Sequence, residues 1–212
     1  MENKYINMPI TSTNALIIFT RNPELGKVKT RLSATVGDES ALEIYKLLIN
    51  HIVEVSENIN VDKYVFYSEN IQENDVWNNA VFNKELQKGD DLGIRMKNAF
   101  EFLFNQGYNK VIIVGSDIYE ITPEDIENAF SNLKTNDFVI GPAGDGGYYL
   151  LGMKQLKKEL FENKAWGTNT VFEETIKDLK SEKVSLLSVK SDVDVYEDIL
   201  GVDDFKQFLL QP

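Results

Sequence analysis

One segment, residues 111–117 (VIIVGSD), constrains the fold more than any other part of the chain. Its first four residues form a short, continuous apolar run, which is typical of a strand buried on both faces of a parallel sheet. Gly115 and Ser116 allow a tight turn and leave Asp117 at the carboxyl end of that strand, where open α/β sheets bind ligands. Asp117 is therefore a candidate ligand for a divalent cation that bridges phosphate oxygens. A simple turn residue is the alternative, since Asp is common in turns.

Apolar runs with strand character alternate with helical patterns from one end of the chain to the other. The expected strands cover residues 15–20, 63–68, 81–86, 111–114, 137–141, 148–151 and 184–189. The expected helices cover residues 37–58, 92–106, 170–180 and 192–210, with one more that starts at Thr122. The link between residues 141 and 148 is too short for a helical crossover, so we expect a local reversal there. The pattern predicts a three-layer α/β/α fold with a mostly parallel, mixed sheet.

Composition excludes several classes of function. Lys and Arg number 22 against 34 Asp and Glu, a net charge of −12, which argues against general binding to nucleic acid. The chain has no Cys and a single His, His51, so disulfides, thiolate nucleophiles and Cys- or His-rich zinc sites are excluded.

The ends and the hydropathy of the chain give a second set of expectations. No stretch of 18 apolar residues occurs, so no membrane span is expected. Residues 1–14 lack the apolar segment of a signal peptide, and we expect a cytoplasmic protein. We predict one domain, residues 1–212, in which residues 1–13 form a loose arm that could reach a partner subunit, so a homodimer stays open.

The loop after the first strand concentrates positive charge. Arg21, Lys27, Lys29 and Arg31 lie within eleven residues, between a strand end and a helix start. Cationic side chains and helix-end amides together can hold a diphosphate. The glycine spacing matches neither a Walker A loop nor GxGxxG. A solvated basic loop on an acidic protein is the alternative.

A second candidate segment is GPAGDGGYY, residues 141–149. It holds more glycine than a hairpin turn needs, and glycine lets a ligand approach the backbone closely. Asp145 is a candidate for binding sugar hydroxyls, for a second metal contact or for a general base, and Gly146, Gly147 and Tyr148 for sugar or acceptor contacts. Adjacent strand residues point to opposite faces, so only one of the two tyrosines can face a ligand from the strand. A plain hairpin is the alternative.

Two further segments could contact a nucleotide or a sugar. In GDDLGIRM, the acids suit a helix N-terminus, whereas Gly93 and Arg95 suggest recognition of a base or ribose. In WGTNT, Trp166, Thr168 and Asn169 could form the wall of a sugar or base site, or Trp166 could act as a hydrophobic staple for the next helix.

In this order, the segments FTRNPELGKVKTRL, GDDLGIRM, VGSD, GPAGDGGYYLLG and WGTNTV resemble one family, over about residues 15–175. It is the bacterial GT-A-fold glycosyltransferases of the arsenosugar-biosynthesis type, which are related to phospholactate and molybdopterin guanylyltransferases. The resemblance implies a nucleotide-diphospho-sugar transferase fold, a nucleotide donor, and Mg²⁺ or Mn²⁺. It places Lys27, Lys29 and Arg31 at the diphosphate, Asp117 at the metal and Asp145 at the sugar or acceptor.

The resemblance also has open points. The late segment DVDVYEDI is similar to a DxDTxxD segment of related nucleotidyltransferases, so Asp145 or a residue of 192–194 could complete the metal shell. Ile118 and Tyr119 replace the small residue and proline of the family pattern, and Asn169 replaces an aspartate.

The leading functional hypothesis is transfer of a sugar from a nucleoside-diphosphate sugar to a small-molecule acceptor. A nucleotidyltransferase that releases pyrophosphate is the second hypothesis. A non-catalytic nucleotide-binding protein is the third, and the altered positions 118, 119 and 169 support it.

Overall fold

The structure, a computed structural model, describes residues 9–209 and is built on a seven-stranded sheet of order β3-β2-β1-β4-β6-β5-β7. The strands are β1 (Asn14–Thr20), β2 (Asp62–Tyr67), β3 (Phe82–Leu86), β4 (Lys110–Gly115), β5 (Phe138–Pro142), β6 (Tyr148–Met153) and β7 (Val184–Leu186). Only β6 runs antiparallel to its neighbours, and it lies between β4 and β5. The predicted mixed, mostly parallel sheet with a local reversal is confirmed.

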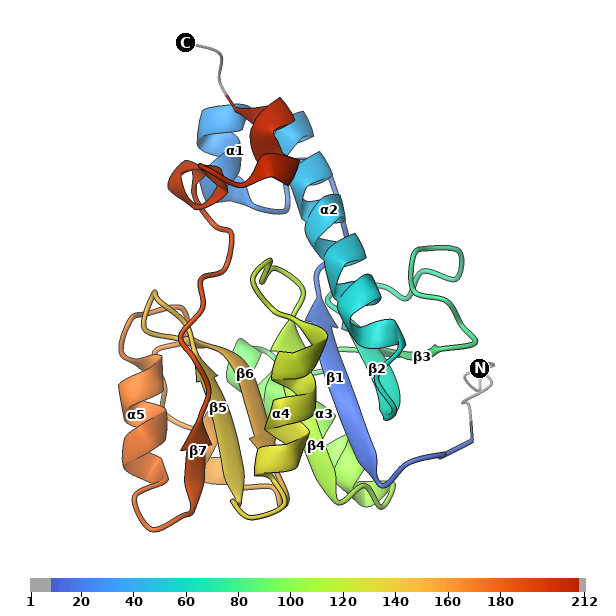
Figure 1. Cartoon of the computed structure of the whole chain (residues 1–212), viewed down its shortest axis with the longest axis vertical. Helices are drawn as coiled ribbons and strands as arrows, with labels where there is room; N and C mark the ends of the chain where they lie inside the picture. The colour runs from blue at the N-terminus through green and yellow to red at the C-terminus, as the bar shows by residue number, and fades with distance from the viewer. Residues whose placement is uncertain (1–8, 210–212) are drawn as a thin grey trace.

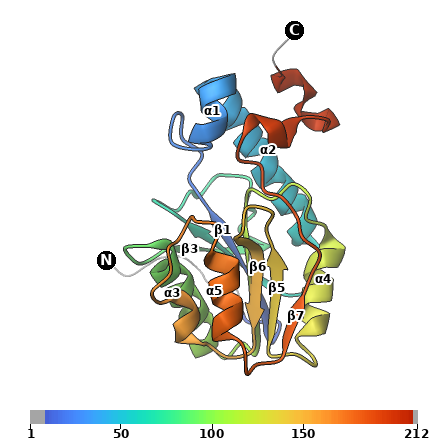
Figure 2. The same ribbon diagram turned by 90° about the vertical axis from the view of Figure 1, so that its left-hand side faces the viewer.

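Helices cover both faces of the sheet (Figures 1 and 2). They are α1 (Thr30–Val36), α2 (Asp38–Glu57), α3 (Leu92–Asn105), α4 (Pro123–Asn132) and α5 (Val171–Asp178), with 3₁₀ helices η1 (Lys158–Phe161), η2 (Tyr196–Ile199) and η3 (Asp203–Phe208). In β1, Leu16 and Ile18 pack in the core under α2 and α4, whereas Ala15 and Ile17 pack in the core under α3. Because both strand faces are buried, the strand sequence is continuously apolar.

Local capping signals decide where two of the helices begin. Thr122 and Asp125 form a capping box at the start of α4, and the Asp91 side chain accepts a hydrogen bond of 2.8 Å from Ile94 N at the start of α3. The helix α5, expected over residues 170–180, begins without a side-chain cap, because Thr170 Oγ1 lies 3.0 Å from Thr168 Oγ1 instead.

Two parts of the chain differ from the sequence predictions. The short helix α1 begins inside the segment expected to be a loop, because Leu32 is buried against α2. The final helix predicted over residues 192–210 is replaced by η2 and η3, and residue 210 lies outside the described residues. Asp198 accepts hydrogen bonds of 2.8 Å from both Asp194 N and Val195 N, and Gly201 has a φ of 79° that interrupts the helix. These 3₁₀ helices lie beside α1 and α2 above the sheet (Figure 1).

The predicted N-terminal arm falls mostly on residues 1–8, outside the described residues. Its last part is held: Thr11 N donates to Asp62 Oδ2 at 3.0 Å and Ser12 N donates to the same oxygen at 3.2 Å. Within residues 9–209, no helix is both long enough and apolar enough to cross a membrane.

Candidate active site

Two adjoining pockets open at the edge of the sheet where β1 and β4 end. The large pocket has a volume of ≈ 740 Å³ and the small pocket ≈ 200 Å³. Asp117, directly after β4, lines both. The predicted position of Asp117 at a ligand-binding edge is therefore supported by the shape of the molecule.

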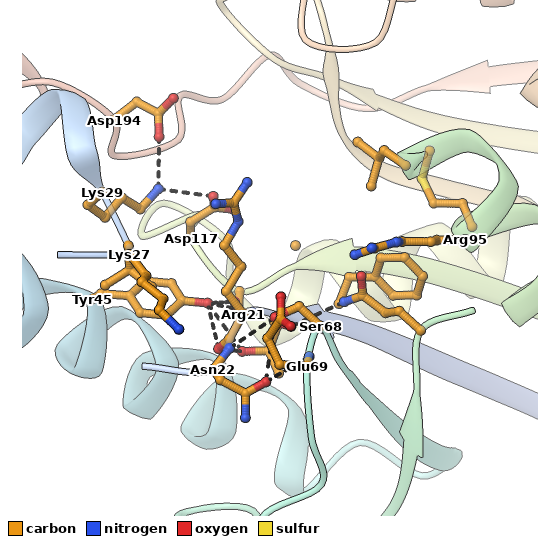
Figure 3. A pocket seen from close by; sticks show the side chains of 18 of the residues that line it. Arg21, Asn22, Lys27, Lys29, Tyr45, Ser68, Glu69, Arg95, Asp117 and Asp194 are labelled. Carbon is orange, nitrogen blue, oxygen red and sulfur yellow. Dashed lines mark hydrogen bonds and ion pairs between the residues drawn. The ribbon is translucent and has the colours of Figure 1, made fainter. Parts of the chain in front are cut away.

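Cations gather in the large pocket. Its lining includes all the basic residues singled out from the sequence: Arg21, Lys27, Lys29, Arg31 and Arg95. They come from the loop after β1, the start of α1 and the first turn of α3. In Figure 3 the Arg95 side chain points into the pocket from the side opposite to Lys29. Six carboxylates line the same pocket, so the basic side chains offer local contacts for the phosphates of an extended ligand rather than a uniformly positive surface.

Lys29 is the most constrained of these cations. It has a left-handed φ of 49°, a conformation that non-glycine residues adopt rarely and at a cost of about 1–3 kcal/mol. Its ammonium lies 3.0 Å from Asp117 Oδ2 and 2.9 Å from Asp194 Oδ1, and its side chain is only 5% exposed (Figure 3). Burial alone would lower the pKa of Lys29, but the two carboxylates outweigh it and the pKa is raised. Lys29 is thus held as a cation at the meeting point of the two pockets.

The remaining cations are held more loosely. Lys27 pairs with Glu24 at 2.6 Å, and its side chain is 69% exposed. Arg31 Nη1 lies 3.4 Å from Asp194 Oδ2, with 70% of the side chain exposed. Arg95 Nε donates to Gly89 O at 2.9 Å. These side chains can move to a ligand at little cost, because exposed ion pairs contribute little to stability.

The C-terminal segment brings two further acids to Asp117. Val193 N donates to Asp117 O at 3.1 Å, and this places Asp192 and Asp194 beside Asp117, with carboxylate oxygens within 4.8 Å of one another. Burial, with Asp117 and Asp194 nearby, raises the pKa of Asp192 to about 6. We call these three residues the acid triad. Clustered carboxylate oxygens suit a hard divalent cation such as Mg²⁺ or Mn²⁺.

The acid triad is relevant to the choice of metal ligands, because the sequence left open whether Asp145 or a residue of 192–194 completes the metal shell. The group that could hold a metal ion contains Asp192 and Asp194 with Asp117, and Asp145 stands outside it. Asp194 does not start the helix expected over residues 192–210, since its side chain accepts a hydrogen bond from Lys29.

Asp145 instead lines the small pocket, in the turn between β5 and β6. Its Oδ1 accepts a hydrogen bond of 2.8 Å from Gly147 N, which fixes the carboxylate relative to the turn. Gly147, Tyr148, Trp166 and Thr168 also line this pocket, as predicted for sugar or acceptor contacts. These five residues, counting Asp145, were singled out from separate segments of the sequence and line one pocket in the structure.

Three predicted site residues do not line the pockets. Gly146, Asn169 and Gly93 line neither of the two pockets that the structure describes here. A Cβ on Gly146 would lie 2.2 Å from Asn169 O, so this glycine allows the turn to pack against the backbone before α5. A Cβ on Gly93 would lie 2.4 Å from Trp166 Nε1, so Gly93 lets the indole pack against α3 and does not face a nucleotide.

Two polar residues that the sequence did not indicate organise the large pocket. Tyr45 OH, on α2, lies 2.9 Å from Ser116 Oγ and accepts a hydrogen bond of 2.8 Å from Arg21 N; burial raises the pKa of Tyr45, which stays neutral (Figure 3). Asn22 is buried, and its Oδ1 accepts a hydrogen bond of 3.0 Å from Glu69 N. Two features of the sequence could have indicated these residues. Tyr45 carries a hydroxyl on the apolar stripe of a helix, and Asn22 is a polar residue shortly after a buried strand.

The two residues that depart from the family pattern after VGSD are structural. Ile118 is buried and contributes to the wall of the small pocket. Tyr119 donates a hydrogen bond to Asp204, and its ring lies 5.0 Å from that of Phe205 and 4.8 Å from that of His51. Tyr119 therefore anchors η3. His51 lies at this boundary, with Nε2 3.0 Å from Ile121 O, as expected for a residue without a catalytic role.

Solved structures of other proteins are similar to the fold of this chain. A Desulfovibrio desulfuricans G20 protein, provisionally described as a nucleotide-diphospho-sugar transferase, is 29% identical with a TM-score of 0.82, over 92% of this chain and 91% of that one. A cytidylyltransferase from Leptospira borgpetersenii has a TM-score of 0.59 at 11% identity, over 94% of this chain and 88% of that one. Rv0371C from Mycobacterium tuberculosis, in complex with manganese, has a TM-score of 0.55 at 9% identity, over 88% and 96% of the two chains.

The similarity to the Desulfovibrio protein confirms the predicted nucleotide-diphospho-sugar transferase fold and indicates a transferase, and the Leptospira and Mycobacterium structures share the fold. No curated protein matches the sequence. The family model described as "Uncharacterized protein conserved in bacteria (DUF2064)" matches residues 51–168, more than half of the chain. The chain therefore belongs to the bacterial DUF2064 family and carries the nucleotide-diphospho-sugar transferase fold.

Proposed function

We propose that this protein is a metal-dependent glycosyltransferase that moves a sugar from a nucleoside-diphosphate sugar to a small-molecule acceptor. One observation carries the proposal: a large pocket that contains the basic side chains and a small pocket lined by carboxylates alone among charged groups meet at Asp117. A sugar nucleotide in the large pocket would bring its diphosphate to this junction. The acceptor would enter from the small pocket, so the two substrates would meet where the chemistry must occur.

The cations of the large pocket would hold the diphosphate. Lys29 is already placed at the junction, whereas Lys27, Arg31 and Arg95 are partly or largely exposed and free to close on a bound ligand. Tyr45 fixes the backbone of Arg21 at the end of β1. These groups would stabilise the negative charge that develops on the departing diphosphate.

The acid triad would hold the metal. Three carboxylates with oxygens within 4.8 Å of one another are a suitable donor set for Mg²⁺ or Mn²⁺. Lys29 Nζ, within 3.0 Å of two of them, shows that this position accepts positive charge. A divalent ion bound there supplies Lewis-acid stabilisation of phosphate oxygens.

The bond changes follow from this placement. The acceptor hydroxyl oxygen forms a bond to the anomeric carbon, and the bond from that carbon to the β-phosphate oxygen breaks, with its electron pair leaving on the nucleoside diphosphate. Asp145, fixed by Gly147 N at 2.8 Å, would take the hydroxyl proton. Gly147, Tyr148, Trp166 and Thr168 would position the sugar and acceptor.

A nucleotidyltransferase is the second candidate, and the fold of the Leptospira cytidylyltransferase supports it. The same cations would hold a triphosphate, and pyrophosphate would leave. A non-catalytic nucleotide-binding protein loses part of its support, since Tyr119 is explained by its packing against η3. We also propose that residues 1–212 act as one domain in the cytoplasm, without nucleic acid as a partner, in keeping with the net charge of −12.

A thermal-shift panel in Mn²⁺ would test the proposal, with nucleoside-diphosphate sugars, diphosphates and triphosphates as ligands. A ligand at a hundred times its Kd adds about 2.7 kcal/mol to the free energy of unfolding. That corresponds to a rise in Tm on the order of 5–10 °C for a chain of this size. We expect a metal-dependent shift with one sugar nucleotide and its diphosphate, followed by release of the nucleoside diphosphate when acceptor is added. Release of pyrophosphate from a triphosphate would favour nucleotidyl transfer instead.

A further inference from the structure

We infer that the acceptor is a small neutral or cationic molecule that carries a hydroxyl on an apolar frame, and that the small pocket excludes anions. The inference rests on the proposed function and names the chemical class of its acceptor. It depends on the contrast in charge between the two adjoining pockets.

The small pocket has acids and no opposing cations. Its lining includes Asp117, Asp145 and Asp192, and among the residues that the structure describes as its walls there is no Lys, Arg or His. The large pocket has five basic side chains beside its six carboxylates, so the cations that line the two pockets lie on one side of Asp117 only. A carboxylate or phosphate on the acceptor would find no cationic partner, and burying an unpaired charge is costly.

A bound metal ion and a bound donor do not make the charge of the small pocket positive. One divalent cation on the acid triad and the Lys29 ammonium together carry three positive charges against the four carboxylates of the triad and Asp145, so one negative charge remains. The donor diphosphate would add further negative charge at the junction. An anionic acceptor would therefore be repelled in the state in which it must bind.

The rest of the small pocket is apolar. Met96, Tyr148, Trp166 and Val171 line it, together with Leu92, which is 45% exposed. Gly93 allows the Trp166 indole to lie against α3, where a Cβ would come within 2.4 Å of it. Flat aromatic and aliphatic walls suit a ring or a short aliphatic frame.

The size of the pocket limits the acceptor further. Its volume of ≈ 200 Å³ is below the roughly 300–1,000 Å³ typical of sites for drug-sized ligands. A single ring with one or two substituents matches that volume, and the hydroxyl would point toward Asp145.

Three compounds on one frame provide the test: 1,4-cyclohexanedimethanol, 4-(aminomethyl)cyclohexylmethanol and 4-(hydroxymethyl)cyclohexanecarboxylate. They are neutral, cationic and anionic, and each carries the same hydroxymethyl group. Binding would be followed in Mn²⁺ with saturating donor diphosphate by Trp166 fluorescence in the Trp77→Phe variant, because the chain has only two Trp and Trp77 is buried away from both pockets. Ligand-observed NMR on the wild-type protein gives the same Kd values if that variant folds poorly.

We expect the neutral and cationic compounds to bind about 10-fold or more tightly than the carboxylate, a difference of about 1.4 kcal/mol. In Asp145→Asn the carboxylate should gain affinity relative to the neutral compound. Asp203→Asn, in η3 and 84% exposed, is the matched control and should leave the ratio unchanged. A carboxylate that binds as tightly as the others, or no binding of any of the three, would overturn the inference. Failure of every nucleotide in the thermal-shift panel would instead count against the proposed function.

Discussion

The two halves of the sheet contribute residues to the site in different ways. In the half β3-β2-β1-β4, all strands are parallel and the site is supplied by loops that follow strand ends, such as the basic loop after β1. In the half β6-β5-β7, the reversed β6 starts at the edge where its neighbours end. A hairpin turn of five residues, 143–147, therefore reaches the site and carries Asp145. The parallel half supplies the cations, and the reversed half supplies a fixed carboxylate beside an apolar wall.

The C-terminal segment connects these halves. It leaves β7 at one end of the sheet order and brings Asp194 to Lys29, which belongs to the parallel half. Asp117 and Lys29 therefore form the boundary at which the two kinds of site meet. Mutations on either side of that boundary should have separable effects on donor and acceptor.

Asp117→Asn should have the largest effect, because it acts on both sides of the boundary at once. We expect the transfer rate to fall by roughly 10³-fold or more, since metal-ion and charge stabilisation of a transition state is worth several kcal/mol. Mn²⁺ affinity measured by calorimetry should fall with it, while the Tm stays near that of the wild type. Asp203→Asn is the control in an exposed acid of η3. Wild-type turnover in Asp117→Asn would remove Asp117 from the metal site.

Lys29→Gln should affect the donor side alone. Loss of one charged hydrogen bond to phosphate, worth about 1.5–3 kcal/mol, should weaken binding of the nucleoside diphosphate by about 10- to 100-fold. Without nucleotide, Mn²⁺ should bind more tightly than to the wild type, because the ammonium within 3.0 Å of Asp117 and Asp194 no longer competes. Lys27→Gln, at a side chain that is 69% exposed, is the matched comparison and should have a smaller effect on both. Weaker Mn²⁺ binding in Lys29→Gln would show that the lysine supports the triad instead of competing for it.

Gly93→Ala should affect the acceptor side alone. The new Cβ would lie 2.4 Å from Trp166 Nε1, so the indole must shift and the wall of the small pocket must change. We expect the KM for acceptor to rise about 10-fold, as for other losses of packing in an apolar pocket. The Kd for the donor diphosphate should stay within twofold. Gly107→Ala is a useful control for glycine replacement, since a Cβ there meets nothing within 4 Å, although its φ of 97° adds backbone strain. Equal effects on donor and acceptor would argue that the pockets are one site.

The sequence predicted most of the parallel half and less of the rest. The buried strands that contain Ile17 and Ile113 are visible in the sequence as apolar runs. The positions of Lys29 and Asp117 follow from the ends of those strands. The helix expected from residue 192 did not form, because Asp194 makes contacts with Lys29, 165 residues away in the chain, which local patterns do not contain. The role of the Tyr45 hydroxyl is not visible in the sequence, because it depends on α2 lying beside the ends of β1 and β4.

Asp62→Asn should have the smallest effect on the site, because Asp62 lies at the opposite edge of the sheet, where it holds the chain before β1. Hydrogen bonds from Thr11 and Tyr108 outweigh burial and lower the pKa of Asp62 from 3.8. A lowered folded-state pKa stabilises the protein above the unfolded value, and this stabilisation is lost as the pH falls through the folded value. At pH 7 the variant should lose about 1.5–3 kcal/mol in urea unfolding, the size expected for hydrogen bonds to a charged group. The difference from the wild type should shrink below about pH 4, while donor and acceptor affinities at pH 7 stay unchanged. A difference that grows at low pH would mean that Asp62 is stabilised in its protonated form, and altered affinities would mean that the two edges of the sheet are coupled.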